Sequence, residues 1–210
     1  MSLPFVTSPR RRQLFAVAAV FAVVLWSAAV VAGIQRIWAY EGTPGEETSV
    51  PASWPDSALV SVDRERATLM MFVHPLCACT RASLTELRAA LDRMEGSPSV
   101  WIVLLSPHGM VEDWGKRIAE IAARIPEATI VTDLEGTAAD KFGASTSGHV
   151  VLYDRGGGLM FSGGITAGRG HVGDNSGRRG LVAAIQSGGD SAHEHPIFGC
   201  GLDDPEPLRQ

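Results

Sequence analysis

The most prominent feature of the hydrophobic pattern is one unbroken apolar run near the N-terminus. It extends from Leu14 to Ile34 without a charged residue and follows the basic cluster at 10–12. Roughly 20 helical residues at about 1.5 Å each cross a hydrocarbon layer of about 30 Å. The run therefore predicts a transmembrane anchor with a cytoplasmic N-terminus and an exported remainder. A signal peptide cleaved before Gly33 is the alternative.

The rest of the chain alternates between short apolar runs and stretches with helical spacing. Continuous apolar runs of strand length stand at 68–73 (TLMMFV), 100–105 (VWIVLL), 129–132 (TIVT), 149–154 (HVVLYD) and 159–164 (LMFSGG). Apolar residues at three- and four-residue spacing predict helices over 84–94 and 114–125, with shorter ones over 135–142 and 179–186.

The order of these elements predicts an α/β domain of three layers. Strands separated by helices pair in parallel, whereas the last two strands are joined by a Gly-rich turn and predict an antiparallel hairpin. The Pro, Gly, Ser and Glu residues before the first strand indicate a linker. The expected divisions are a cytoplasmic segment 1–13, the anchor 14–34, a linker 35–57, the domain 58–187 and a flexible tail 188–210.

Composition and charge narrow the range of partners. Apolar residues make up 45% of the chain and charged residues 20%, which is typical of a globular protein. The net charge is −5, and Lys and Arg are not clustered outside the N-terminal dozen residues. A nucleic-acid partner is therefore not expected.

Candidate chemistry lies directly after the first buried strand. In the stretch FVHPLCACTRASLTEL (72–87), Cys77 and Cys79 stand one residue apart, where the strand gives way to a helix. The unpaired N–H groups and partial positive charge of a helix N-terminus favour a thiolate, which is the reactive form of cysteine. This makes Cys77 the candidate nucleophile, with an exposed and readily ionised sulfur.

The motifs around these thiols resemble the membrane-anchored, extracytoplasmic branch of the thioredoxin-like superfamily. The similarity covers about residues 58–187, and it is greatest to RedB-type thioredoxin-like proteins through HPLCAC, the TSG turn at 146–148 and GGITAGRGHVGDN at 163–175. The resemblance implies a three-layer thioredoxin-like fold, consisting of a mixed sheet with parallel strands and an antiparallel hairpin. It also implies a role in the maturation or redox upkeep of exported proteins.

Two positions depart from the superfamily pattern. The second cysteine of that pattern would stand where this chain has Thr80, and the cis-proline before the hairpin would stand where it has Gly148. That proline shapes the groove in which a substrate strand docks in the superfamily. Because Thr80 stands in place of the second cysteine, the ordinary pair of exchanging cysteines is absent.

Three interpretations of the thiols stay open. Cys77 and Cys79 could form a strained, oxidising disulfide. Cys77 could instead attack alone and be resolved by Cys200, carried on the flexible tail. In the third interpretation His74, Cys77 and Cys79, with His171 as a further candidate, bind copper or zinc, since imidazole and thiolate suit both metals.

The loop after the hairpin supplies auxiliary candidates. The hairpin's second strand runs parallel to the first strand, so this loop emerges at the same edge of the sheet as Cys77. Arg169 could hold a thiolate or a substrate carboxylate, and His171 could carry a proton or bind a metal. The Gly, Asp and Asn residues could equally supply only turn geometry and a helix cap.

These observations support two functions. The first is a thiol–disulfide oxidoreductase, held by a single-pass anchor in the cytoplasmic (inner) membrane, with its domain in the periplasm or outside the cell. Its partners are exported client proteins or a redox partner protein, and it requires no diffusible cofactor. The second is a metal-delivery protein that uses the same fold to carry copper or zinc on His74, Cys77 and Cys79.

Overall fold

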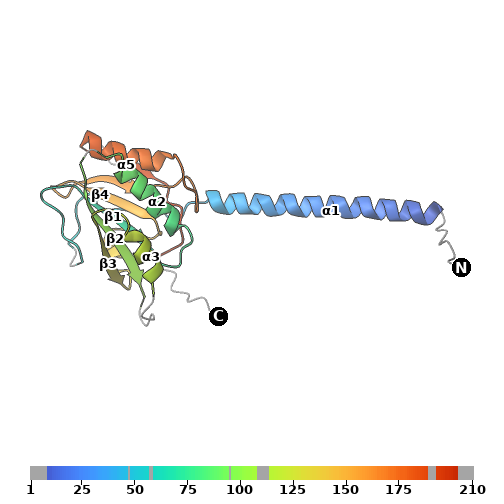
Figure 1. The fold of residues 1–210 in the computed structure, drawn as a ribbon, viewed down its shortest axis with the longest axis horizontal. Coiled ribbons are helices and arrows are strands. Elements are labelled where there is room, and N and C mark those ends of the chain that lie inside the picture. Colours follow the sequence, from blue (N-terminus) through green and yellow to red (C-terminus); the bar gives the residue numbers. More distant parts are fainter. Residues whose placement is uncertain are drawn as a thin grey trace. The chain divides into compact units, whose positions relative to one another are not determined.

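The computed structural model describes residues 9–46, 48–56, 59–94, 96–107, 114–188 and 193–202. The chain divides into two units, Met1–Tyr40 and Glu41–Gln210. The described part of the first unit belongs to α1 (Pro9–Gly42), drawn as one long helix in Figure 1. Its large apolar side chains are exposed. By length and composition α1 can cross a membrane, as either a single-pass anchor or a signal sequence. It extends beyond the predicted span at both ends.

The second unit is built on one six-stranded mixed sheet. Its elements in chain order are β1 (Thr68–Val73), α2 (Thr80–Leu91), β2 (Ser99–Ser106), α3 (Lys116–Ala122), β3 (Ala128–Leu134), α4 (Thr137–Lys141), β4 (His149–Tyr153), β5 (Leu159–Gly163), α5 (Ser176–Ser187) and β6 (His193–His195). The strand order is β3-β2-β1-β4-β5-β6. β4 is antiparallel to both β1 and β5, whereas the other neighbours pair in parallel.

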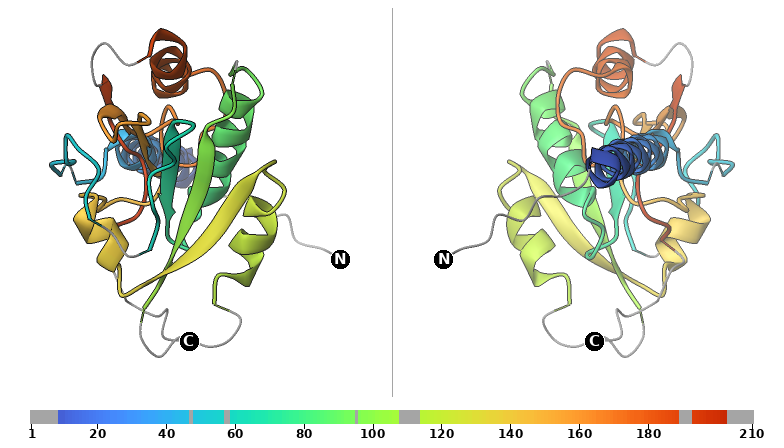
Figure 2. Two further views of the ribbon diagram at one scale, coloured as in Figure 1. Left: turned by 90° about the vertical axis from the view of Figure 1, so that its left-hand side faces the viewer. Right: turned by 90° about the vertical axis from the view of Figure 1, so that its right-hand side faces the viewer.

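Each face of the sheet buries its own hydrophobic core. Because successive side chains of a strand point to opposite faces, Leu69, Met71 and Val73 of β1 pack toward α2, α3 and α5, while Met70 and Phe72 pack toward α4. Figure 2 shows the sheet between these two sets of helices. All six residues of β1 are buried, which explains why its sequence is a continuous apolar run rather than an alternating one. The predicted three-layer architecture is confirmed.

The predicted linker differs from the structure. α1 continues to Gly42, and the described part of 43–56 belongs to the second unit and packs against the rest of it. Trp54 packs edge-on against Phe142 and Tyr153, with ring centroids 5.0 and 5.2 Å apart. The Tyr153 hydroxyl also donates to the Pro51 carbonyl at 2.8 Å. A composition typical of a linker did not reveal that one aromatic ring and a few backbone groups could hold the segment to the core.

The predicted flexible tail also differs wherever the structure describes it. Residues 193–195 form β6 beside β5, and Ile197 and Leu202 are buried. The Gly45 amide donates to the Ile197 carbonyl at 2.7 Å. The segment 193–202 is therefore part of the folded domain. Residues 189–192 and 203–210 of the expected tail lie outside the described residues.

Candidate active site

The two neighbouring thiols lie in a short turn between β1 and α2. The Cys77 amide donates to the His74 carbonyl at 3.2 Å, and the Thr80 amide donates to the Cys77 carbonyl at 3.1 Å. α2 begins at Thr80, so Cys79 occupies the position just before its first residue. The predicted placement of Cys77 between a buried strand and a helix is what the structure shows.

A buried hydroxyl pair holds this turn against the loop before β4. The Thr80 hydroxyl donates to the His74 carbonyl at 2.9 Å and lies 3.1 Å from the Ser147 hydroxyl. The Ser147 hydroxyl in turn accepts from the His74 amide at 2.9 Å. Thr80 therefore has a positioning role. Ser147 was not among the sequence candidates, although it is the central residue of the TSG turn.

Gly148 leads into β4 with a backbone conformation that excludes proline. Its φ is +91°, whereas proline is fixed near −65°. Its amide donates to the Phe72 carbonyl at 2.8 Å, a bond that proline could not make. A side chain here would also meet the Ser83 hydroxyl at 2.7 Å. The described residues contain no cis peptide bond, in agreement with the predicted absence of a cis-proline.

Cys200 lies directly against Cys77. The Cys200 amide donates to the Cys77 sulfur at 3.4 Å, and the Cys200 carbonyl accepts from the Ser147 amide at 2.8 Å. With this segment in place Cys77 is only 3% exposed. The expectation of an exposed Cys77 sulfur is therefore wrong, because the C-terminal segment covers it. Of the pairings considered from the sequence, the structure brings together Cys77 and Cys200 as well as Cys77 and Cys79.

The three thiols differ strongly in acidity. The Cys200 thiol donates a hydrogen bond to the Cys77 sulfur and lowers the pKa of Cys77 to about 4, despite burial, with further help from the Cys200 and Cys79 amides. Burial and the neighbouring Cys77 thiolate raise the pKa of Cys79 to about 11. Donation to Cys77 and burial also raise the pKa of Cys200. Cys77 is thus ionised at neutral pH, and a proton is held beside it on Cys200.

The loop after β5 brings Arg169 to the thiols. The Arg169 guanidinium donates to the carbonyl of Gly199, next to Cys200. Its positive charge partly offsets the effects that raise the pKa values of Cys79 and Cys200. His171 lies elsewhere: its ring pairs with Glu41 at 3.3 Å, and about half of its side chain is exposed. The structure thus places Arg169, but not His171, beside the sulfurs.

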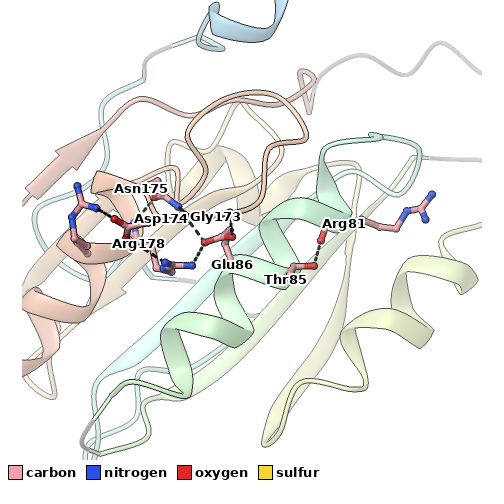
Figure 3. A network of polar contacts seen from close by, with 8 residues as sticks. Arg81, Thr85, Glu86, Gly173, Asp174, Asn175 and Arg178 are labelled. Atoms are coloured by element: carbon pink, nitrogen blue, oxygen red, sulfur yellow. Dashed lines mark hydrogen bonds and ion pairs between the residues drawn. The ribbon is translucent and has the colours of Figure 1, made fainter.

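A buried carboxylate fastens this loop to α2. Glu86 is fully buried and accepts from the Gly173 amide at 2.7 Å and the Asn175 side chain at 3.2 Å. The Arg178 guanidinium of α5 binds it at 2.5 Å (Figure 3). The Asn175 side chain also caps α5 by accepting from the Arg178 amide at 2.8 Å. The sequence interpretation assigned Glu86 no such role, because adjacent residues on a helix do not share a face and Leu87 gave no sign that Glu86 is buried.

The proposed metal ligands do not converge. The His74 ring accepts from the Leu76 amide at 3.1 Å and lies edge-on to Trp114 at 5.8 Å, while His171 pairs with Glu41. Across the residues that the structure describes, no three His, Cys, Asp or Glu side chains are arranged to hold a metal ion. The residues present therefore do not fit the ligand set His74, Cys77, Cys79 and His171.

Comparison with known proteins supports the fold. No protein-family model and no curated protein matches the chain. The structure is similar to an uncharacterised conserved protein from Geobacillus kaustophilus, with TM-score 0.59 and 16% identity over 79% of this chain and 100% of that one. A hypothetical protein from Sinorhizobium meliloti 1021 matches with TM-score 0.52 and 20% identity, over 75% of this chain and 98% of that one.

A third solved structure matches less well, and its name describes a function. It is the exposed lipoprotein thioredoxin of Streptococcus pneumoniae, with TM-score 0.42 and 14% identity over 59% of this chain and 86% of that one. All three identities are below 25%, so the two matches with TM-scores above 0.5 concern the fold alone, and the third supports no inference. The RedB-type resemblance stays a prediction from the motifs. The central β1, its parallel neighbour β2, the antiparallel β4 and β5 and the thiol turn ahead of α2 give the unit Glu41–Gln210 a thioredoxin-like fold.

Proposed function

We propose that the chain is a membrane-anchored, extracytoplasmic thiol–disulfide oxidoreductase in which Cys77 attacks and Cys200 resolves. The observation that carries this proposal is the position of Cys200, whose amide and thiol both donate to the Cys77 sulfur. A low-pKa thiolate with a second thiol beside it is the arrangement that disulfide exchange requires. The partners are exported proteins that carry a disulfide.

The reaction proceeds in two exchanges. The Cys77 thiolate attacks one sulfur of the client disulfide, forms a mixed disulfide and releases the other client sulfur as a thiolate. Cys200 then gives up its proton and attacks the Cys77 sulfur, which forms a Cys77–Cys200 disulfide and releases the second client thiolate. The client gains two electrons, which the two protein sulfurs lose. Cys200 supplies one of the two protons that the released client thiolates take up, and water supplies the other, because Cys77 starts as a thiolate. An exported dithiol protein returns the chain to its reduced form by the reverse exchanges.

Cys79 fits the resolving role less well. It lies beside Cys77, yet the largest cause of its raised pKa is burial, which the attack of Cys77 on a client does not remove, so its thiol stays protonated and unreactive. Cys200 is also protonated at rest, but the attack of Cys77 on a client consumes the negative charge that keeps it so. The pKa of Cys200 is then free to fall. Resolution is in this way delayed until the mixed disulfide exists.

Trapping experiments test the assignment. The reduced full-length protein is mixed with a disulfide-bonded peptide and quenched with acid, and cross-linked cysteines are identified by mass spectrometry. Cys200→Ser should accumulate the peptide on Cys77, Cys79→Ser should turn over the peptide like the wild type, and Cys77→Ser should be inert. Trapping in Cys79→Ser together with full turnover in Cys200→Ser would assign resolution to Cys79. A metal analysis of the same reduced sample tests the alternative function, the delivery of copper or zinc.

A further inference from the structure

Residues 199–202, which we name the strap, pair with the loop before β4 as an extra antiparallel strand. The Ser147 amide donates to the Cys200 carbonyl at 2.8 Å, and the Leu202 amide donates to the Ser145 carbonyl at 2.7 Å. Thr146 and Gly201 form an antiparallel bridge between these two bonds. The strap thus presents Cys200, one residue before this bridge, to the Cys77 sulfur.

A client cysteine must reach the position that Cys200 already fills. Cys77 is 3% exposed beneath the strap, so a client sulfur cannot contact it while the strap is bound. Once the strap leaves, the Ser147 amide and the Ser145 carbonyl lose their partners and can bind another extended backbone. The same movement uncovers the nucleophile and the edge to which a peptide can pair.

We propose that the strap is an internal mimic of the client, and that clients are extended segments that displace it and pair with 145–147. This inference rests on the proposed function for its chemistry but not for its geometry. The strap competes with the client before the first exchange. After the client has bound through Cys77, the strap displaces the client backbone from 145–147 in turn and brings Cys200 back to resolve the mixed disulfide.

The two glycines of the strap indicate which clients fit. A Cβ on Gly199 would lie 1.9 Å from the Ser147 carbonyl oxygen and 2.9 Å from its carbon, and backbone atoms cannot move aside cheaply. A Cβ on Gly201 would meet no atom within 4 Å. Clients that adopt the strap's path therefore need glycine directly before the reactive cysteine, whereas the residue directly after it is unrestricted.

This difference provides a matched pair of variants. In the reduced full-length protein in detergent, Gly199→Ala should release the strap and Gly201→Ala should not. Amide exchange, followed at single residues by mass spectrometry, should accelerate at Ser147 and Leu202 by at least about tenfold in Gly199→Ala, because these two amides lose their acceptors. The Gly148 amide, bonded to β1, should stay protected in both variants and reports that the domain is folded.

A peptide probe then tests docking directly. The probe is the strap sequence PIFGCGL, residues 196–202, with serine in place of cysteine and a fluorophore for anisotropy. It should bind Gly199→Ala at least about tenfold more tightly than the wild type, because an internal competitor reduces apparent affinity by the fraction of open molecules. A probe carrying alanine in place of the glycine before serine should bind weakly to both proteins.

The outcomes separate this inference from the proposed function. Equal probe affinity for the wild type and Gly199→Ala, although exchange at Ser147 is accelerated in the variant, would overturn the mimic. Unchanged exchange at Ser147 in Gly199→Ala would overturn the steric argument on Gly199. Equal affinity of the glycine and alanine probes would overturn the glycine requirement. Docking as expected, in a protein whose Cys77 never forms a mixed disulfide, would uphold the docking edge and refute the oxidoreductase.

Discussion

Replacement of Cys200 by alanine should raise the pKa of Cys77. The Cys200 thiol is the largest cause of the low value of about 4, and Cys200→Ala removes this donor while it keeps the backbone amide 3.4 Å from the Cys77 sulfur. A hydrogen bond to a charged group contributes about 1.5–3 kcal/mol, and one pH unit corresponds to about 1.36 kcal/mol. The pH at which half of the Cys77 thiol is ionised, which is the midpoint of its titration, should therefore rise by about one to two pH units.

The midpoint is measured from the pH dependence of alkylation. The fully reduced protein is treated with iodoacetamide between pH 3 and 9, and modification of the peptide that contains Cys77 is followed by mass spectrometry. The wild type should react at a nearly constant rate above pH 6, whereas Cys200→Ala should gain an inflection near pH 5–6. Better access in the variant changes the plateau but not the midpoint, so the two effects are separable.

Cys79→Ala is the matched control for this measurement. The backbone amide of Cys79 is a larger cause of the low pKa of Cys77 than the Cys79 thiol, and alanine keeps that amide. The midpoint of the control should therefore stay closer to that of the wild type than the midpoint of Cys200→Ala. An unchanged midpoint in Cys200→Ala, or an equal rise in Cys79→Ala, would refute the argument that the Cys200 thiol sets the acidity of Cys77.

Three further predictions address stability and topology. The pKa of Cys77 is lower in the folded than in the unfolded protein, so the reduced fold should gain stability as the pH rises. Between pH 4 and 8.5 the free energy of unfolding, measured by urea titration, should rise relative to that of Cys77→Ala by up to about 1.4 kcal/mol per pH unit. Parallel pH dependences of the two proteins would contradict this. Glu86→Gln removes the buried charged partner of Arg178, leaves it only the exposed Asp174, and should cost about 3–5 kcal/mol in the same assay. Glu120→Gln on the exposed side of α3 should change stability by less than about 0.5 kcal/mol. Alkaline phosphatase fused after Gly45 should be active if α1 directs the C-terminal unit out of the cytoplasm, and an inactive fusion would reverse the orientation.

The fold was predictable because its strands are buried on both faces. Runs such as 68–73 and 100–105 are continuous in the sequence because both sides of these strands contact apolar layers. The turn that carries Cys77 was predictable for the same reason, since the end of β1 and the helical spacing after it are local signals. The position of Arg169 followed from strand direction alone.

The contacts that complete the site could not be read from local patterns. The strap pairs with residues more than 50 positions earlier, and its few irregular residues have neither helical nor strand periodicity. Its burial of Cys77 was therefore missed, and with it the main cause of the low pKa. Trp54 was missed for a related reason, because a single aromatic residue in a stretch rich in Pro and Gly gives no sign of which surface it covers.

Contact between Cys77 and Cys200 also has a mechanical consequence. The two residues are 123 positions apart, so a bond between their sulfurs would tie the first strand of the sheet to the last described segment of the chain. By chain-entropy arguments the closure of so long a loop stabilises a fold by about 5 kcal/mol. The oxidised molecule should accordingly survive heat and proteases better than its reduced counterpart, which would make its lifetime depend on the supply of electrons.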